Sequence, residues 1–385
     1  MRTLALALLT FISLAVGTAR AQDTMEDYQR IFKEGIDALE GGRYDDGIAS
    51  FRRCLELNPE DAVCAYNIAC GYSMKGSVDD GITWLGHSAD WGFGLAEGNI
   101  EHAETKDTDL ANLRADARFA DCIGRMKETK KRLDEYLAKP AAEWAPESRG
   151  DGPVGLLVVL HDNGSTRDDV VSGPWRRVAE ELGFVLVAPS GRIAARVDPA
   201  DGMSWMPNFG EYQQRYWIYE KPVQDAVSAA RKKYDVDRSR IYVAGAGDAG
   251  IVAMNIAIGS PGLFKGVVTL DAPVVEQLVQ EKAPNAGKMG LRARLLWSDR
   301  PNFLEGQEVT REDYASYLGQ RFSGWSVDAS IDRLPARPAE RAEGEDEAAA
   351  KAREEAETAW IAAVADAVRD LVPAPAEPVE AGAGK

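Results

Sequence analysis

The chain has 385 residues, a length that favours two domains over one. Its formal net charge is −17, from 45 basic and 62 acidic residues. This balance argues against nucleic acid and anionic lipid surfaces as partners, because both require basic patches on the protein. The four cysteines and three histidines do not stand at the spacings of a metal site, so we expect neither a metal ion nor a cofactor.

The first 22 residues have the pattern of a secretory signal peptide. Arg2 precedes an apolar run over residues 4–16, and the small-residue motif Ala19-Arg20-Ala21 follows. The run is too short to span a membrane, and the first cysteine after it is Cys54, which disfavours a lipid anchor. We therefore expect an exported protein, periplasmic or extracellular, with no membrane span.

All four cysteines lie in the first third of the mature chain: Cys54, Cys64, Cys70 and Cys122. One interpretation is that they are small buried residues on helices. The other is that up to one disulfide forms, since export permits it.

An internal repeat with a period of 34 residues covers residues 25–92. Gly42, Asp45, Asp46, Gly47 and Ile48 recur as Gly76, Asp79, Asp80, Gly81 and Ile82. The tetratricopeptide unit is the helical-pair repeat of this length. Its small, aromatic and proline positions match Gly35, Gly47, Phe51, Cys54 and Pro59 in the first unit, and Ala69, Tyr72, Gly81, Leu85 and Ser88 in the second.

Residues 23–138 therefore resemble a tetratricopeptide domain, with a degenerate third unit at 107–126 that closes the stack. Buried positions are expected there at Leu110, Leu113, Phe119 and Ile123. The resemblance implies a groove that binds a protein or peptide partner.

Three prolines and two glycines in residues 139–153 predict a linker between two domains. Beyond it, apolar runs typical of buried strands alternate with helical patterns, which predicts a parallel sheet covered on both faces. Strands are expected at 154–160, 184–188, 241–244, 266–270, 294–297 and 327–331, and helices at 175–182 and 221–234.

The end of the chain is rich in Ala and Glu and predicts a helix within residues 339–372. Its apolar stripe suits docking on a core and consists of Trp360, Ile361, Val364, Ala365 and Val368. Residues 373–385 carry no apolar pattern, and we expect them to be disordered.

The stretch Ile241 to Ala257, IYVAGAGDAGIVAMNIA, predicts a buried strand, a glycine-rich corner and a helix. It resembles the nucleophile elbow of the α/β-hydrolase superfamily, in which Gly-x-Ser-x-Gly holds a serine on a strained turn. Aligned without gaps, the motif places Gly247 where the family has its serine. The corner is expected to be present and its nucleophile to be missing.

Residues 154–338 resemble the phospholipase/carboxylesterase and polyhydroxyalkanoate-depolymerase branch of that superfamily, which implies a doubly wound, mostly parallel sheet. LLVVLHDNGST, residues 156–166, is similar to the strand and loop that offer backbone N–H groups to a developing oxyanion. Asp162 stands where the family has glycine, and its carboxylate would oppose the developing negative charge. Asp299 is similar to the family's catalytic acid.

The family's catalytic base is a histidine after the last strand, and residues 334–338 contain none. The three histidines are His87, His102 and His161, and all of them precede the elbow. The resemblance therefore implies that nucleophile, base and oxyanion loop have all changed in the direction that removes acyl transfer.

Two residues have an alternative catalytic interpretation. Asp248 could replace the serine, as carboxylates do in related dehalogenases and epoxide hydrolases, or it caps the following helix. His161 could act as a borrowed base, or it orients its own loop as in the family.

The insert at residues 199–220 is crowded with aromatic side chains: Trp205, Tyr212, Tyr216, Trp217 and Tyr219. They either form the wall of a cleft for a small molecule, glycan or peptide, or they pack the insert itself.

We interpret the chain as an exported, non-catalytic binding or scaffold protein without catalytic residues. The alternative is an active esterase or carboxylesterase-type hydrolase that uses displaced residues.

Overall fold

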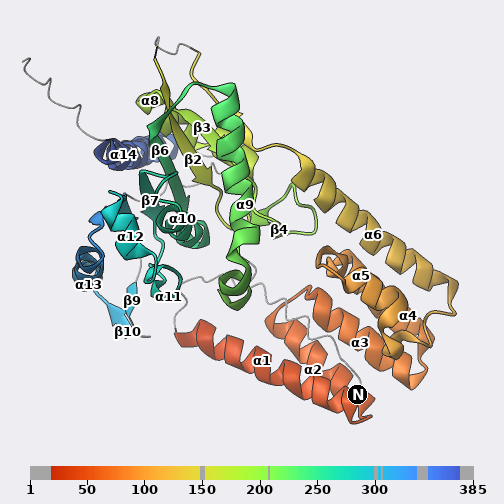
Figure 1. Ribbon diagram of the computed structural model, residues 1–385. Helices are drawn as coiled ribbons and strands as arrows, with labels where there is room; N and C mark the ends of the chain where they lie inside the picture. The colour runs from red at the N-terminus through yellow and green to blue at the C-terminus, as the bar shows by residue number, and fades with distance from the viewer. Residues whose placement is uncertain are drawn as a thin grey trace, which may run out of the picture. The chain divides into compact units, whose positions relative to one another are not determined.

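A computed structural model describes residues 19–147, 152–206, 209–298, 302–304, 307–335 and 346–372 (Figure 1). Most of the predicted signal peptide and the predicted disordered tail lie outside these residues. Contacts divide the chain into two compact units. The first comprises the chain up to Pro140 with residues 163–166 and 190–219, and the second comprises residues 141–162, 167–189 and those from Glu220 onward.

The first unit begins with two helix pairs, α1 (Ala19–Glu40) with α2 (Tyr44–Leu57), and α3 (Ala62–Lys75) with α4 (Val78–Asp90). The helices α2 and α4 begin 34 residues apart, so the sequence period is also a structural period. Glycine allows the helices to approach closely. A Cβ atom at Gly47 of α2 would lie 2.5 Å from Leu39 Cδ2 of α1.

The degenerate third unit consists of short turns and one long helix. The turns are η1 (Phe93–Leu95), α5 (Asn99–Glu101), the π-helical turn η2 (His102–Lys106) and η3 (Thr108–Leu110), and the long helix is α6 (Ala117–Ala138). The four predicted apolar positions of this stretch are all buried: Leu110, Leu113, Phe119 and Ile123.

A small hairpin from the middle of the chain completes the first unit. Strand β4 (Ile193–Ala194) pairs antiparallel with β5 (Met203–Ser204). Ala194 and Met203 form a buried cluster with Leu133 and Tyr136 of α6. Residues 190–219 therefore pack with the helices, whereas the sequence pattern had grouped them with the sheet.

The second unit is built on a seven-stranded sheet with the order β1-β3-β2-β6-β7-β8-β11. These strands are β1 (Ala142–Trp144), β2 (Val154–Leu160), β3 (Val185–Ala188), β6 (Val236–Ala246), β7 (Gly266–Leu270), β8 (Arg292–Trp297) and β11 (Asp328–Arg333). All neighbours are parallel except β1, which runs antiparallel to β3.

Strand β1 corrects one prediction, because it lies inside the stretch that the prolines and glycines mark as a linker. Ala142 pairs with Ala188 and Trp144 with Leu186, so backbone hydrogen bonding extends the sheet into this stretch. The three residues are too few to produce an apolar pattern.

Helices cover both faces of the sheet. On one face, α8 (Pro174–Leu182) and α14 (Glu347–Leu371) bury alternate strand residues such as Leu157, Tyr242 and Val268, and α7 (Arg167–Ser172) lies beside α8. The intervening strand residues, such as Leu156 and Val243, are buried too. Helix α10 (Gly247–Gly259) packs on β6 and β7.

Further elements complete the unit: the later part of α9 (Phe209–Lys233), α11 (Glu276–Val279), α12 (Ala283–Lys288), α13 (Arg311–Gly324) and the short pair β9 (Asn302–Leu304) and β10 (Gln307–Val309). The backbone of α9 leaves helical geometry at Arg215, with φ −134° and ψ 25°. None of the described helices combines the length and the apolar character needed to cross a bilayer.

Helix α14 is an integral part of the second unit. The residues of its predicted docking stripe are all buried, and the Trp360 ring lies edge-on to Trp175 of α8 with centroids 5.4 Å apart. Arg294 of β8, 4% exposed, forms ion pairs with Asp370 of α14 and Asp328 of β11. The mostly parallel sheet with one antiparallel edge strand, covered on both faces, has the predicted α/β-hydrolase fold.

Candidate active site

The candidate site lies where the central parallel strands end. The register pairs Leu160 of β2 with Gly245 of β6, and Ala246 of β6 with Leu270 of β7. The residues that follow these strands therefore leave the sheet at one edge, where ligands bind in open α/β sheets. They are His161 and Asp162 after β2, Gly247 and Asp248 after β6, and Asp271 after β7.

The corner between β6 and α10 has the shape of a nucleophile elbow. Strand β6 ends at Ala246, and helix α10 begins at Gly247, whose φ of +51° lies in the left-handed region. A Cβ atom at Gly245 would lie 2.6 Å from the Ala249 carbonyl carbon, whereas one at Gly247 would meet nothing within 4 Å. Position 247 thus faces open space and has no side chain to place there.

Asp248 lies in the first turn of α10 and does not cap it. No side chain caps the helix at Ala246, and among the described residues no hydrogen bond or ion pair reaches the Asp248 carboxylate. The expected cap is wrong because α10 starts at Gly247, so Asp248 is already helical and its short side chain cannot reach back to the free N–H groups. Burial raises the pKa of this carboxyl group.

His161 is buried, with 1% of its surface exposed. Its Nδ1 lies 2.9 Å from the Asp162 carbonyl oxygen. Because a carbonyl oxygen only accepts, Nδ1 carries the proton in the neutral ring. Burial lowers the pKa of His161 to about 4, far below the value near neutrality that suits a general base. The contacts therefore favour a residue that orients its own loop.

The acid side of the predicted triad lies only partly within the structure. Asp299 and residues 336–345, which include most of the loop where the family's histidine stands, are outside the described residues. Ser298, which precedes Asp299, donates from its backbone N to Asp271 Oδ1 at 2.7 Å and from its hydroxyl to Asp271 Oδ2 at 2.9 Å.

Asp271 is a residue of this edge that the sequence reasoning missed. Its φ of +47° is unusual for a residue with a side chain, and strained backbone of this kind concentrates at functional sites. Asp271 joins the ends of β7 and β8. The available sequence signal was weak: one polar residue directly after the buried run GVVTL.

The expected aromatic wall is not formed. Trp205, Tyr212 and Tyr219 are at most 7% exposed and belong to the core of the first unit. Only Trp217, 57% exposed, and the half-buried Tyr216 reach solvent, with ring centroids 5.7 Å apart. Most of these residues therefore pack the insert itself, the second of the two interpretations.

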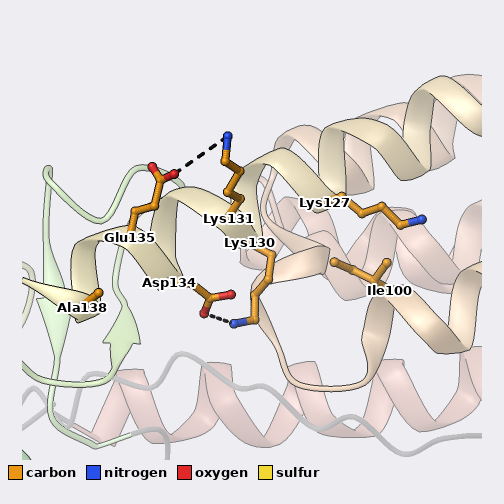
Figure 2. Close-up of a pocket in the computed structure, with 7 residues that line it drawn as sticks. All are labelled: Ile100, Lys127, Lys130, Lys131, Asp134, Glu135 and Ala138. Carbon is orange, nitrogen blue, oxygen red and sulfur yellow. Dashed lines mark hydrogen bonds and ion pairs between the residues drawn. The ribbon is translucent and has the colours of Figure 1, made fainter.

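A pocket of about 460 Å³ opens on α6 and α5 of the first unit and contains none of the residues predicted for a site (Figure 2). Its three lysines each face a carboxylate. Lys127 lies 2.7 Å from Glu104, Lys131 lies 3.8 Å from Glu135, and Lys130 pairs with Asp134. With these charges paired, the pocket shows no preference for an anionic ligand.

The two remaining histidines belong to the first unit. The exposed His87 ring stacks on Trp91 with centroids 5.2 Å apart. His102 Nε2 lies 3.4 Å from Asp107 Oδ2. Within the ranges that the structure describes, no three His, Cys, Asp or Glu side chains gather in a way that could hold a metal ion.

No protein-family model and no curated protein matches the sequence. The structure is similar to a carboxylesterase from Mesorhizobium loti, at 18% identity over 52% of this chain and 87% of that chain, with a TM-score of 0.37. A dienelactone hydrolase-like promiscuous phosphotriesterase from metagenomic libraries is 16% identical over 60% and 92% of the two chains, with a TM-score of 0.41.

An uncharacterised protein from Bacillus cereus is 11% identical over 86% of this chain and 98% of its own, with a TM-score of 0.36. At such low identities and scores these likenesses carry no argument about activity. The fold assignment rests on the strand order and directions given above.

Proposed function

We propose that this chain is an exported, non-catalytic binding protein, in which a hydrolase-type domain has lost acyl-transfer chemistry and serves as a recognition surface. One observation carries the proposal. Gly247 holds the left-handed corner where the superfamily places its serine, and it offers no atom that could attack a carbonyl.

The chain's histidines support the same conclusion. An attacking hydroxyl needs a base to take its proton, and no histidine follows the elbow in the sequence. His161 is the histidine nearest to the corner in the strand register, but burial holds its pKa at about 4. A ring with so low a pKa removes a proton from a hydroxyl poorly at neutral pH.

Asp248 is the basis of the alternative function, an esterase that uses a displaced carboxylate. Its position one residue after Gly247 and the absence of a bonded partner among the described residues leave it accessible to a ligand. Burial raises its pKa, however, which favours the protonated form and weakens it as a nucleophile. A second step would need a base to activate water.

The helical unit supplies the binding function. Its two consecutive helix pairs repeat with the period and small-residue pattern of tetratricopeptide domains. Stacked helix pairs form extended concave surfaces, and we assign this one to a protein or peptide partner. The hydrolase-type domain would offer the open corner at Gly247 to a small molecule or glycan.

Labelling by a fluorophosphonate and hydrolysis of short p-nitrophenyl esters test the proposal on the full chain. We expect no labelling, and ester cleavage equal to buffer, for the wild type and for Asp248→Asn. Asp168→Asn, which alters an exposed aspartate of α7, is the matched control. Cleavage above buffer that disappears in Asp248→Asn and persists in Asp168→Asn would replace the proposal with the esterase.

A further inference from the structure

Two cysteines meet at the junction between the first and second helix pairs. Cys54 lies in the last turn of α2, and Cys64 lies in the first turn of α3. Both side chains are completely buried, and both are free thiols here. Asp61 caps α3 by accepting from the backbone N of Val63 and Cys64, which fixes the start of the helix that carries Cys64.

The two thiol groups are hydrogen-bonded to each other, and Tyr28 of α1 packs against both. The Tyr28 hydroxyl lies 3.5 Å from Cys64 Sγ and donates to Asp61 Oδ2 at 2.7 Å. Cys54 Sγ lies 3.9 Å from the Tyr28 carbonyl oxygen. The sulfur atoms therefore face each other in a dry site enclosed by three helices.

The other two cysteines have no thiol partner. Cys70 Sγ lies 3.7 Å from Asp107 Oδ2. Cys122 Sγ lies 3.9 Å from the Ile82 carbonyl oxygen and 3.6 Å from Arg125 Nη2. All four cysteines are within the described residues, so Cys54 and Cys64 are the one pair placed to react with each other.

We propose that Cys54 and Cys64 form a disulfide that cross-links α2 to α3, made by exchange with a small-molecule disulfide such as oxidised glutathione. One thiolate attacks a sulfur of the oxidant and releases one glutathione thiolate. The second protein thiolate then attacks the mixed disulfide and releases the other. The two cysteines are oxidised, the oxidant is reduced to two thiols, and the two thiol protons end on them.

The bond forms during folding, before the helices close over the sulfur atoms. In the folded protein the hydrogen bond from Cys54, and then burial, raise the pKa of the Cys64 thiol. Thiolate is the attacking species, and it is scarce in this site. An oxidant must also reach side chains that have no exposed surface. The folded, reduced protein therefore reacts much more slowly than the unfolded chain.

The cross-link closes a loop of about ten residues and joins one helix pair to the next. It holds the junction that sets how the pairs stack, and it keeps Tyr28 and α1 packed on both. Loop closure of this size raises the midpoint of thermal unfolding by about 5–10 °C for a unit of this length.

Refolding of the full chain in mixed oxidised and reduced glutathione tests the inference. Intact mass should fall by two hydrogen atoms, and peptide mapping should show one cross-linked pair, Cys54 with Cys64. The unfolding midpoint should rise as given above, and reductant should abolish the rise. The folded, reduced protein should form the bond at least about 100-fold more slowly in the same buffer.

The cross-link should be absent in Cys54→Ala and present in Cys122→Ala, the matched control. Because Cys54→Ala could destabilise the core, the peptide map of the wild type decides the matter if that variant does not fold. Four alkylated thiols after refolding, or a pair that includes Cys70 or Cys122, would overturn the inference.

Discussion

Replacing the buried His161 with asparagine should change how the stability of the second unit depends on pH. Asparagine is neutral at every pH used, and its amide can donate to the Asp162 carbonyl oxygen in place of Nδ1. The variant therefore keeps the hydrogen bond and removes the titrating ring. The charged groups that act on His161 are Asp162, Asp169 and Arg167, and they remain in both proteins.

The magnitude follows from the lowered pKa. Burial lowers the pKa of His161 from 6.5 to about 4, so the unfolded chain binds a proton between these values and the folded one does not. Stability is therefore unaffected above pH 6.5 and is lost as the pH falls towards 4. The loss reaches about 3 kcal/mol at the end of this range.

The assay is urea unfolding of both proteins, followed by tryptophan fluorescence, at several pH values from 7.5 to 4. Acidic groups titrate in this range too, and their contribution cancels in the difference between wild type and variant. The wild type should lose about 3 kcal/mol relative to His161→Asn as the pH falls. A difference that stays constant over the range would refute the burial of a neutral histidine beside the elbow.

Three substitutions test the packing of the corner and of α14 by the same unfolding assay. Gly250→Ala should cost about 3 kcal/mol, because its Cβ would lie 2.4 Å from Ala272 Cβ. Gly247→Ala meets no neighbour and should cost only about 1 kcal/mol for its left-handed backbone, so equal losses would contradict the described corner. Trp360→Ala should cost about 4 kcal/mol through its contact with Trp175, and a loss below 1 kcal/mol would mean that α14 is not docked.

The central strands and the corner could be predicted because local sequence carries their signal. β2 and β7 begin and end at the predicted residues, since each is a continuous apolar run that the sheet buries on both faces. The corner was predictable for a different reason. Gly245, Gly247 and Gly250 are the residues that permit its close contacts and its left-handed turn, and few other structures need so much glycine in one place.

The features that sequence reasoning missed depend on contacts between distant residues. Residues 190–219 join the helical unit through Ala194 and Met203 against α6, and no local pattern encodes that choice. β1 is a strand only because β3 offers it an edge. The role of Asp248 turned on a one-residue difference in where α10 begins, which is finer than sequence patterns resolve. The strained Asp271 is bonded to Ser298, which lies 27 residues away.

Ester hydrolysis by Gly247→Ser tests the central claim most directly. The new hydroxyl would stand at the left-handed corner in open space, where the superfamily holds its nucleophile. With the pKa of His161 near 4 and no histidine after the elbow, nothing in the account takes its proton. The account predicts turnover of short p-nitrophenyl esters equal to that of Gly247→Ala. Turnover by the serine variant clearly above the alanine variant would show that a working base remains at this edge, and would contradict the account.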